Sequence, residues 1–192
     1  MDLILASSST YRRQLLERLM LPFRCVAPDI DETALPDETP EALALRLSDE
    51  KAEAVAAHYH ECLVIGSDQV ASIEGTLLGK PGNHEVASEQ LRKCSGRRVN
   101  FYTGLAVKCR QSEFSQRHVV CYSVEFRELS ERTIDRYLAR EQPYDCAGSF
   151  KCEGLGITLF RRMQGDDPTS LQGLPLISLS GILLDAGYNL YQ

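Results

Sequence analysis

Three serines and two arginines near the amino terminus are the first residues whose types and spacing could bind a phosphate. The turn Ser7–Ser9 separates a short apolar run, 3–6, from a segment with helical apolar spacing. A turn that ends at a helix amino terminus directs free N–H groups and partial positive charge towards an anion. Arg12 and Arg13 fall in the first helical turn, where a positive charge opposes the helix dipole unless an anion lies nearby. The alternative is an ordinary serine cap, so phosphate binding stays open on this motif alone.

Two lysines could add positive charge to such a site. Lys51 lies on the apolar side of a helix that we predict over about 40–59, which begins with the hydroxyl cap Thr39. An inward lysine either points into a cleft or lays its stem on apolar surface with the ammonium in water. Lys80 lies in a Gly-Lys-Pro turn, which would hold it at a rim, although most turn lysines are merely solvated.

Acidic residues supply the opposite charge. Asp68 comes just after the apolar run 62–66, which is typical of a buried strand, with Ser67 between them. In open α/β sheets ligands gather at the carboxyl ends of strands, where a carboxylate can hold a metal or orient water. The acidic segment 29–32 could contribute a second metal ligand. The alternatives are a turn aspartate and a solvated acidic surface. Cations for a polyphosphate and carboxylates for a metal together indicate metal-dependent chemistry on phosphate compounds.

The elements that must position these residues alternate between strands and helices, which favours an α/β class. A mixed parallel and antiparallel sheet with flanking helices is the expected architecture. No linker separates two domains, so 1–192 is predicted to be a single domain. Beyond the elements already named, the patterns predict strands at 23–26 and 157–161, a long antiparallel hairpin from 99–107 and 118–126, and helices over 85–94, 130–140 and 175–187.

Composition excludes several classes of protein. The 192 residues carry 21 basic and 27 acidic side chains, a net charge of −6, so no strongly basic face for nucleic acid is expected. Seven cysteines without CxxC spacing indicate free thiols in a reducing compartment, and we predict a cytoplasmic protein without a membrane span. Walker A, GxGxxG and GxSxG motifs are absent from the sequence. The expected partner is therefore a small phosphate compound, not a nucleic acid polymer or a membrane.

At these residues the sequence resembles the Maf family of nucleoside triphosphate pyrophosphatases nearly from end to end. The resemblance implies a two-lobed α/β fold with a central cleft, similar to that of the inosine triphosphate pyrophosphatases. It also implies hydrolysis of a nucleoside triphosphate to its monophosphate and pyrophosphate with a divalent cation such as Mg²⁺, Mn²⁺ or Co²⁺. The motifs that carry it are LILASSSTYRRQLL at the start, Asp31-Glu32-Thr33, Glu50-Lys51-Ala52, GSDQV at 66–70, Gly79-Lys80-Pro81, CAGSF at 146–150, EGLG at 153–156 and GLPL at 173–176.

The resemblance also implies a role for each matching residue. Asp68 corresponds to the catalytic aspartate, the proposed base for the attacking water and a metal-linked residue, and Glu32 corresponds to the second metal-linked position. Phosphate contacts are implied for Ser7, Arg12, Lys51 and Lys80, with Arg13, the neighbour of Arg12, as a further candidate.

Three further positions distinguish subgroups of the family. Tyr11, Gln69 and Glu153 occupy them here, and this set resembles the subgroup that acts on 7-methyl-GTP. Two alternatives stay open: a non-catalytic nucleotide sensor in cell-division control, and a pyrophosphatase for other non-standard nucleotides. The sequence also leaves a homodimer open.

Overall fold

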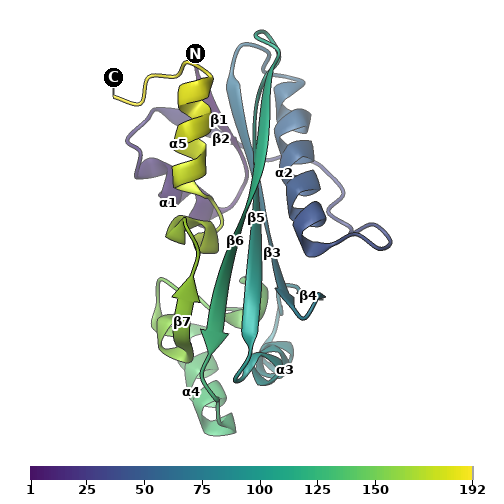
Figure 1. Cartoon of the computed structure of the whole chain (residues 1–192), viewed down its shortest axis with the longest axis vertical. Helices are drawn as coiled ribbons and strands as arrows, with labels where there is room; N and C mark the ends of the chain where they lie inside the picture. Colours follow the sequence, from purple (N-terminus) through teal and green to yellow (C-terminus); the bar gives the residue numbers. More distant parts are fainter. Residues whose placement is uncertain (192) are drawn as a thin grey trace.

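A seven-stranded sheet runs the length of the molecule in the computed structural model, which describes residues 1–191 (Figure 1). The predicted alternation of strands and helices is confirmed. The strands are β1 (Leu3–Ala6), β2 (Phe23–Val26), β3 (Leu63–Ile73), β4 (Thr76–Leu78), β5 (Arg98–Cys109), β6 (Phe114–Phe126) and β7 (Phe160–Gln164). The α-helices are α1 (Thr10–Glu17), α2 (Pro40–Ala56), α3 (His84–Cys94), α4 (Glu131–Glu141) and α5 (Leu176–Asp185). Three short 3₁₀ helices are η1 (Ala147–Ser149), η2 (Leu155–Leu159) and η3 (Pro168–Gln172).

The sheet is mixed, as predicted. Its strand order is β2-β1-β3-β5-β6-β7, and β4 pairs with β3 at one edge. Strands β2, β1 and β3 run parallel, whereas every other pairing is antiparallel. The predicted hairpin is confirmed as β5 and β6, which pair from Arg98 opposite Glu125 to Cys109 opposite Phe114.

Strand β3 continues well beyond the predicted end at Gly66. It stays paired with β5 as far as Ser72, which lies opposite Asn100. Its polar residues remain in the sheet because each finds a partner: Ser67 donates a hydrogen bond to the carbonyl of Gly104, and Asp68 accepts one from Lys51. The expectation that Asp68 follows the end of a strand is therefore wrong, because it lies in the middle of β3.

Two helices begin at the capping residues that the sequence predicted. The hydroxyl of Thr39 accepts a hydrogen bond from the amide of Ala42, and Pro40 opens α2. Ser130 caps α4 in the same way through the amide of Thr133. The predicted strand at 157–161 is wrong in its start: Leu155–Leu159 form η2, at whose first residue the amide donates a hydrogen bond to Glu141, and the strand β7 begins at Phe160.

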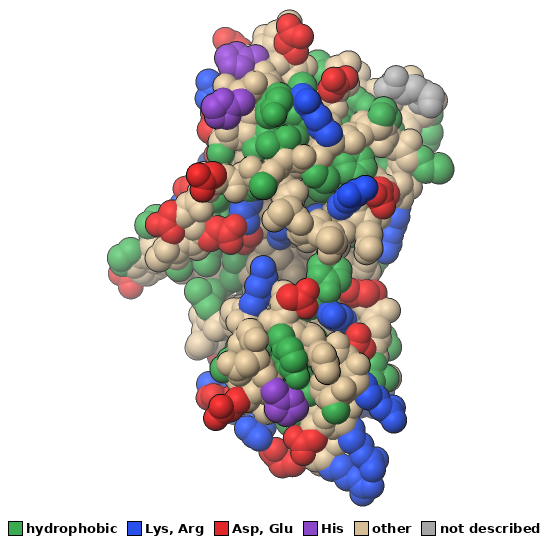
Figure 2. Space-filling view, turned by 180° about the vertical axis from the view of Figure 1, so that it is seen from behind, with side chains coloured by type: hydrophobic (Ala, Val, Ile, Leu, Met, Phe, Trp, Pro, Cys, Tyr) green, Lys and Arg blue, Asp and Glu red, His purple; other side chains and the backbone are tan. Residues whose placement is uncertain are grey.

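Two apolar cores lie on opposite sides of a cleft. Figure 1 shows the helices gathered correspondingly at the two ends of the sheet, which gives the molecule two lobes. One core joins α1 and α5 to β1 and β3, and the other joins α3, α4 and β7 to the far ends of β5 and β6. Figure 2 shows the surface hollowed between the lobes, with charged side chains at the hollow. Among residues 1–191, no helix is both long and apolar enough to cross a bilayer.

Helix α2 packs unusually close to the sheet because two glycines face it. A β-carbon at Gly66 would overlap the backbone carbonyl of Ser48, and one at Gly104 would overlap the backbone carbonyl of Ala44. Backbone atoms cannot move aside as the end of a flexible side chain could. The two glycines therefore set the distance between α2, which carries Lys51, and β3, which carries Asp68.

Replacing Gly104 by alanine should destabilise the protein by about 1–3 kcal/mol, as overpacking does in a well-packed interior. Denaturant unfolding measures this. Gly181→Ala in α5 is the matched control, because a β-carbon there has nothing within 4 Å. A Gly104→Ala protein as stable as the parent would show that α2 can shift freely on the sheet.

Candidate active site

The serine turn after β1 lies at the cleft and is held by hydrogen bonds from its own side chains. Ser7 Oγ accepts a hydrogen bond of 3.1 Å from the amide of Ser9, and Ser9 Oγ caps α1 by accepting the amide of Arg12 at 3.4 Å. Because the Ser7 hydroxyl accepts here, its own hydrogen is left to donate to a ligand. The amino terminus of α1 adds partial positive charge at the same place. The turn thus has the expected form of an anion cradle.

A buried lysine joins two carboxylates at the centre of the cleft. Lys51 Nζ lies 2.6 Å from Asp68 Oδ1 and 2.7 Å from Glu32 Oε1, and the lysine is only 4% exposed. Burial would raise the pKa of Glu32, but its hydrogen bond to Lys51 and the positive charges of Lys51, Lys80 and Arg12 lower it below its usual value. Lys51 therefore points into the cleft, and the alternative of an ammonium in water is wrong.

Arg12 brings a second cation to the same carboxylate. Its Nε donates a hydrogen bond of 2.8 Å to the carbonyl of Gly173, and its Nη2 lies 3.9 Å from Asp68 Oδ1. Burial lowers the pKa of Arg12, although Asp68 and Glu32 oppose this effect; an arginine nevertheless stays charged. Asp68 Oδ2, by contrast, has no hydrogen-bond partner within residues 1–191. One oxygen of the aspartate is therefore held by cations, and the other is free to bind a ligand.

Neighbouring residues of β3 face the other side of the sheet, because side chains alternate along a strand. Gln69 Nε2 donates hydrogen bonds to the carbonyls of Ser170, at 2.7 Å, and Leu171, at 3.0 Å. These carbonyls can only accept, so they fix which end of the amide faces them. Gln69 also lines the cleft, although it lies on the opposite face of β3 from Asp68. Its amide nitrogen connects η3 to the sheet.

Lys80 lines the cleft from the turn after β4 and makes no ion pair within residues 1–191. Its turn is held by a residue that the sequence did not indicate. Gln90 Nε2, from α3, donates a hydrogen bond of 3.0 Å to the carbonyl of Gly79, and Gln90 Oε1 accepts one of 2.5 Å from Ser149. Ser149 has a positive φ of 63°, which is strained for a residue with a side chain. A single amide thus connects the Lys80 turn to the loop at the other end of the cleft.

Gln90→Glu separates the two contacts of this amide. A carboxylate still accepts from Ser149 but cannot donate to Gly79. We expect KM for the substrate to rise by about 3- to 10-fold with kcat less affected, as for loss of a hydrogen bond worth roughly 1 kcal/mol. Steady-state kinetics measure this, with Glu89→Gln on the exposed side of α3 as the control. An unchanged KM would show that the Lys80 turn does not need the Gln90 contact.

The far end of the cleft contains a tyrosine, two thiols and two carboxylates. Tyr11 Oη donates a hydrogen bond of 3.2 Å to Asp145 Oδ2, and Cys146 Sγ lies 3.8 Å from the same hydroxyl. Burial raises the pKa of Tyr11, and Cys146 and Asp145 raise it further, so the hydroxyl keeps its proton. Cys152 Sγ donates to Glu153 Oε2 at 3.3 Å. No local sequence signal indicated Asp145, because its contact with Tyr11 joins residues 134 positions apart.

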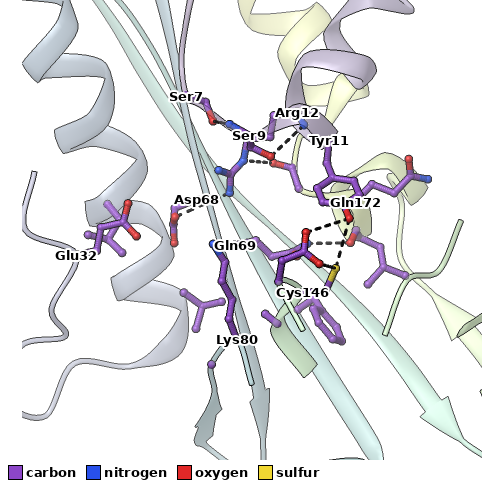
Figure 3. Close-up of a pocket in the computed structure, with 18 of the residues that line it drawn as sticks. Ser7, Ser9, Tyr11, Arg12, Glu32, Asp68, Gln69, Lys80, Cys146 and Gln172 are labelled. Carbon is purple, nitrogen blue, oxygen red and sulfur yellow. Dashed lines mark hydrogen bonds and ion pairs between the residues drawn. The ribbon is translucent and has the colours of Figure 1, made fainter. Parts of the chain in front are cut away.

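These groups surround one cavity of about 680 Å³, a size typical of small-molecule sites. Figure 3 shows Glu32 and Asp68 on one side of it and Tyr11, Cys146 and Gln172 on the other. Nine of the ten residues expected at the site line this cavity: Ser7, Tyr11, Arg12, Glu32, Lys51, Asp68, Gln69, Lys80 and Glu153.

Arg13 is the exception. It does not line the cavity, and its Nε bonds to Glu17 at 3.0 Å on the exposed side of α1. One step along a helix rotates a side chain by about 100°, so Arg12 and Arg13 cannot both face the cleft. The expectation of a phosphate contact from Arg13 is not supported by this position.

The two central carboxylates have donor chemistry that suits a hard divalent cation. Mg²⁺ is usually bound through one or two carboxylates together with substrate phosphates and water. Glu32 and Asp68 both reach the same ammonium, so both face the same point. Within residues 1–191 no group of three or more His, Cys, Asp or Glu side chains gathers as a metal site. The residues therefore fit a cation that is bound jointly with a phosphate ligand.

The mixed sheet and the cation-lined cleft between two lobes define an α/β protein that binds a small polyanion. The chain belongs to the Maf family, because the family model described as Maf-like protein matches residues 2–186. The chain is 55% identical over 186 residues to proteins of Nitrosococcus oceani and Pseudomonas aeruginosa, both named 7-methyl-GTP pyrophosphatase. The match covers 97% of this chain in each case, and 94% and 97% of those proteins.

A solved structure supports the fold independently. The HAM1 protein from Coxiella burnetii superposes with a TM-score of 0.52 at 15% identity, over 96% of this chain and 99% of that one. At that identity the likeness concerns the fold alone. The expected family and fold are thus confirmed.

Proposed function

We propose that the protein hydrolyses 7-methyl-GTP to 7-methyl-GMP and pyrophosphate. The observation that carries this proposal is the buried Lys51, held between Asp68 and Glu32 in a cavity that Arg12 and Lys80 also line. Three cations at one end of a small cavity suit a triphosphate, whose charge is about −4 at neutral pH. The names of the two relatives support the same reaction and the same base.

In this mechanism, Asp68 orients and deprotonates the attacking water. Lys51 and Arg12 hold Oδ1, which leaves Oδ2 to accept a hydrogen bond from water and then its proton. The water oxygen forms a bond to the α-phosphorus, and the bond from that phosphorus to the bridging oxygen breaks. Ser7, the start of α1 and Lys80 bind phosphate oxygens, and pyrophosphate leaves with the bonding electron pair.

We also propose that Glu32 and Asp68 hold a divalent cation together with the substrate. When bound, such a cation neutralises negative charge on the phosphates. Lys51 then exchanges at least one carboxylate contact for a phosphate oxygen, as its four-carbon stem allows. The particular metal, the action of residues 1–192 as a single domain, and a cytoplasmic location are parts of this proposal; the seven free thiols are in keeping with a reducing compartment.

The test is a panel of 7-methyl-GTP, GTP, UTP and dTTP with Mg²⁺, Mn²⁺ or Co²⁺, each compared with EDTA. We expect pyrophosphate as the first phosphate product, the highest kcat/KM for 7-methyl-GTP, and loss of activity in EDTA. Orthophosphate as the first product would contradict cleavage between the α and β phosphates. Binding without hydrolysis would favour a nucleotide sensor, and a higher kcat/KM for another triphosphate would overturn the assigned substrate.

Glu153→Gln tests how the base is selected. The Watson–Crick edge of guanine offers two donors, and a carboxylate accepts both, whereas one end of a glutamine amide is itself a donor. Methylation at N7 makes the base cationic, which adds attraction to the carboxylate. We expect the substitution to cost ~1.5–3 kcal/mol of selectivity for the methylated base, or roughly ten- to a hundredfold in relative kcat/KM.

The same panel of triphosphates measures this, and Glu61→Gln, an exposed acid outside the cavity, is the control. If Glu153→Gln leaves the ranking of the four triphosphates unchanged, the base is recognised elsewhere in the cavity.

A further inference from the structure

The two ends of the cavity differ in net charge: near the serine turn three cations outnumber the carboxylates of Asp68 and Glu32, whereas the charged side chains that line the cavity beyond Tyr11 are acidic. Arg12, Lys51 and Lys80 supply positive charge near the serine turn. Asp145 and Glu153, from the loop that follows α4, supply negative charge beyond Tyr11. A ligand with an anionic tail and a cationic head matches both ends at once. Glu153 already has a role in the proposed function, but Asp145 has none.

Asp145 binds the hydroxyl end of the Tyr11 side chain. Oδ2 accepts the 3.2 Å hydrogen bond from Tyr11, and Oδ1 accepts one of 3.5 Å from Cys146. Lys151 Nζ lies 3.9 Å from Oδ1, and the Asp145 side chain is 62% exposed. The backbone of Tyr11 is fixed in the first turn of α1, so this contact fixes the opposite end of the side chain. The ring is thereby restrained at both ends where it lines the cavity (Figure 3).

The same contact changes the electrostatics of the ring. Burial would raise the pKa of Asp145, but hydrogen bonds from its own backbone amide and Cys146, the charge of Lys151 and the bond from Tyr11 lower it, so the carboxylate stays ionised. A hydroxyl that donates to a carboxylate is polarised, and polarisation of this kind makes the ring face more negative. A more negative ring face binds a cation more strongly.

We infer that Asp145 is a specificity-determining residue that selects a positively charged purine ring, by orienting Tyr11 and by placing a negative charge at the base end of the cavity. This inference rests on the proposed function, because it needs a nucleotide whose base is cationic. The proposed role of Glu153 is to accept hydrogen bonds from the edge of the base. The role inferred for Asp145 is different, because it attracts the positive charge of the base.

Asp145→Asn keeps the shape of the side chain and removes its charge. We expect the ratio of kcat/KM for 7-methyl-GTP to that for GTP to fall by about tenfold, mainly through a higher KM for 7-methyl-GTP. The kcat for GTP should change by less than about twofold, because the phosphate end of the cavity is untouched. Asp135→Asn, an exposed aspartate of α4 outside the cavity, should leave the ratio unchanged.

Tyr11→Phe separates the two parts of the effect, since it keeps the ring and removes the hydrogen bond. The amide oxygen of an asparagine accepts from the Tyr11 hydroxyl more weakly than a carboxylate does, so Asp145→Asn weakens this contact. In the Tyr11→Phe background, Asp145→Asn should lower the ratio by only about threefold, because the contact is already absent and only the direct effect of the charge remains. A full tenfold drop of the kcat/KM ratio in that background would contradict the inference that Asp145 positions Tyr11.

The parent enzyme distinguishes a failure of the proposed function from a failure of the role of Asp145. If the parent does not prefer 7-methyl-GTP over GTP, the proposed function fails. If the parent has this preference and Asp145→Asn keeps it at a normal unfolding midpoint, the role of Asp145 fails while the proposed function stands.

Discussion

Asp68→Asn should reduce turnover by at least ~10²-fold while leaving the fold intact, as expected for loss of a general base. The asparagine still accepts the hydrogen bond from Lys51, so the contact that orients the side chain is kept. The charge that Oδ2 needs in order to take a proton from water is lost. Turnover at saturating substrate and metal measures the effect, because it excludes weaker binding as the cause.

A second aspartate provides the matched control. Asp49 also pairs with a lysine, Lys108, at 3.0 Å, but lies outside the cavity. Asp49→Asn should keep near-normal turnover. If Asp68→Asn also kept near-normal turnover at saturating metal, Asp68 would have no catalytic role, and another group would have to activate the water.

Lys51→Met should have the second largest effect. It removes the cation that separates two carboxylates, so Asp68 and Glu32 then repel each other at the place where a triphosphate must bind. We expect kcat/KM to fall by about 10²-fold or more, since charge-assisted contacts to phosphate are lost as well. We also expect lower stability, by about 3 kcal/mol, because Asp68 is left buried with only the distant Arg12 as a partner.

Lys108→Met separates these effects. Lys108, on β5, also bridges two carboxylates, those of Asp49 and Glu53 on α2. Lys108→Met should reduce the free energy of unfolding but not kcat/KM. Equal losses of kcat/KM in Lys51→Met and Lys108→Met would mean that Lys51 acts only through stability.

Local signals were sufficient for much of the fold and for the inward position of Lys51. The Thr39-Pro40 cap predicted the start of α2, and apolar spacing within that helix predicted that Lys51 lies inward. Two β-rich runs, 99–107 and 118–126, separated by a polar stretch predicted the β5–β6 hairpin. Each of these signals lies within one element, so short-range sequence pattern carries it.

The remaining features depend on contacts between distant residues. Strand β3 passes Gly66 because β5 pairs with it, and Gln69 is engaged by carbonyls about a hundred positions away. Asp145 contacts Tyr11 because the fold brings α1 beside the loop that follows α4. Arg13 was misplaced for a different reason: adjacent helical residues share a sequence motif but not a helix face.

The close contact of α2 with Gly66 and Gly104 has a consequence for how this site can diversify. Backbone atoms set the spacing of Lys51 and Asp68, so exchanges among the apolar side chains Leu43 and Leu47 of α2 leave that spacing unchanged. Asp145 and Glu153, at the base end, lie on the loop 142–154, which contacts the rest of the cavity through side chains such as Tyr11 and Gln90. Mutations in that loop can therefore alter which base is accepted while Lys51 and Asp68 keep their positions. The substrate can then change without a change in the residues proposed to carry out hydrolysis.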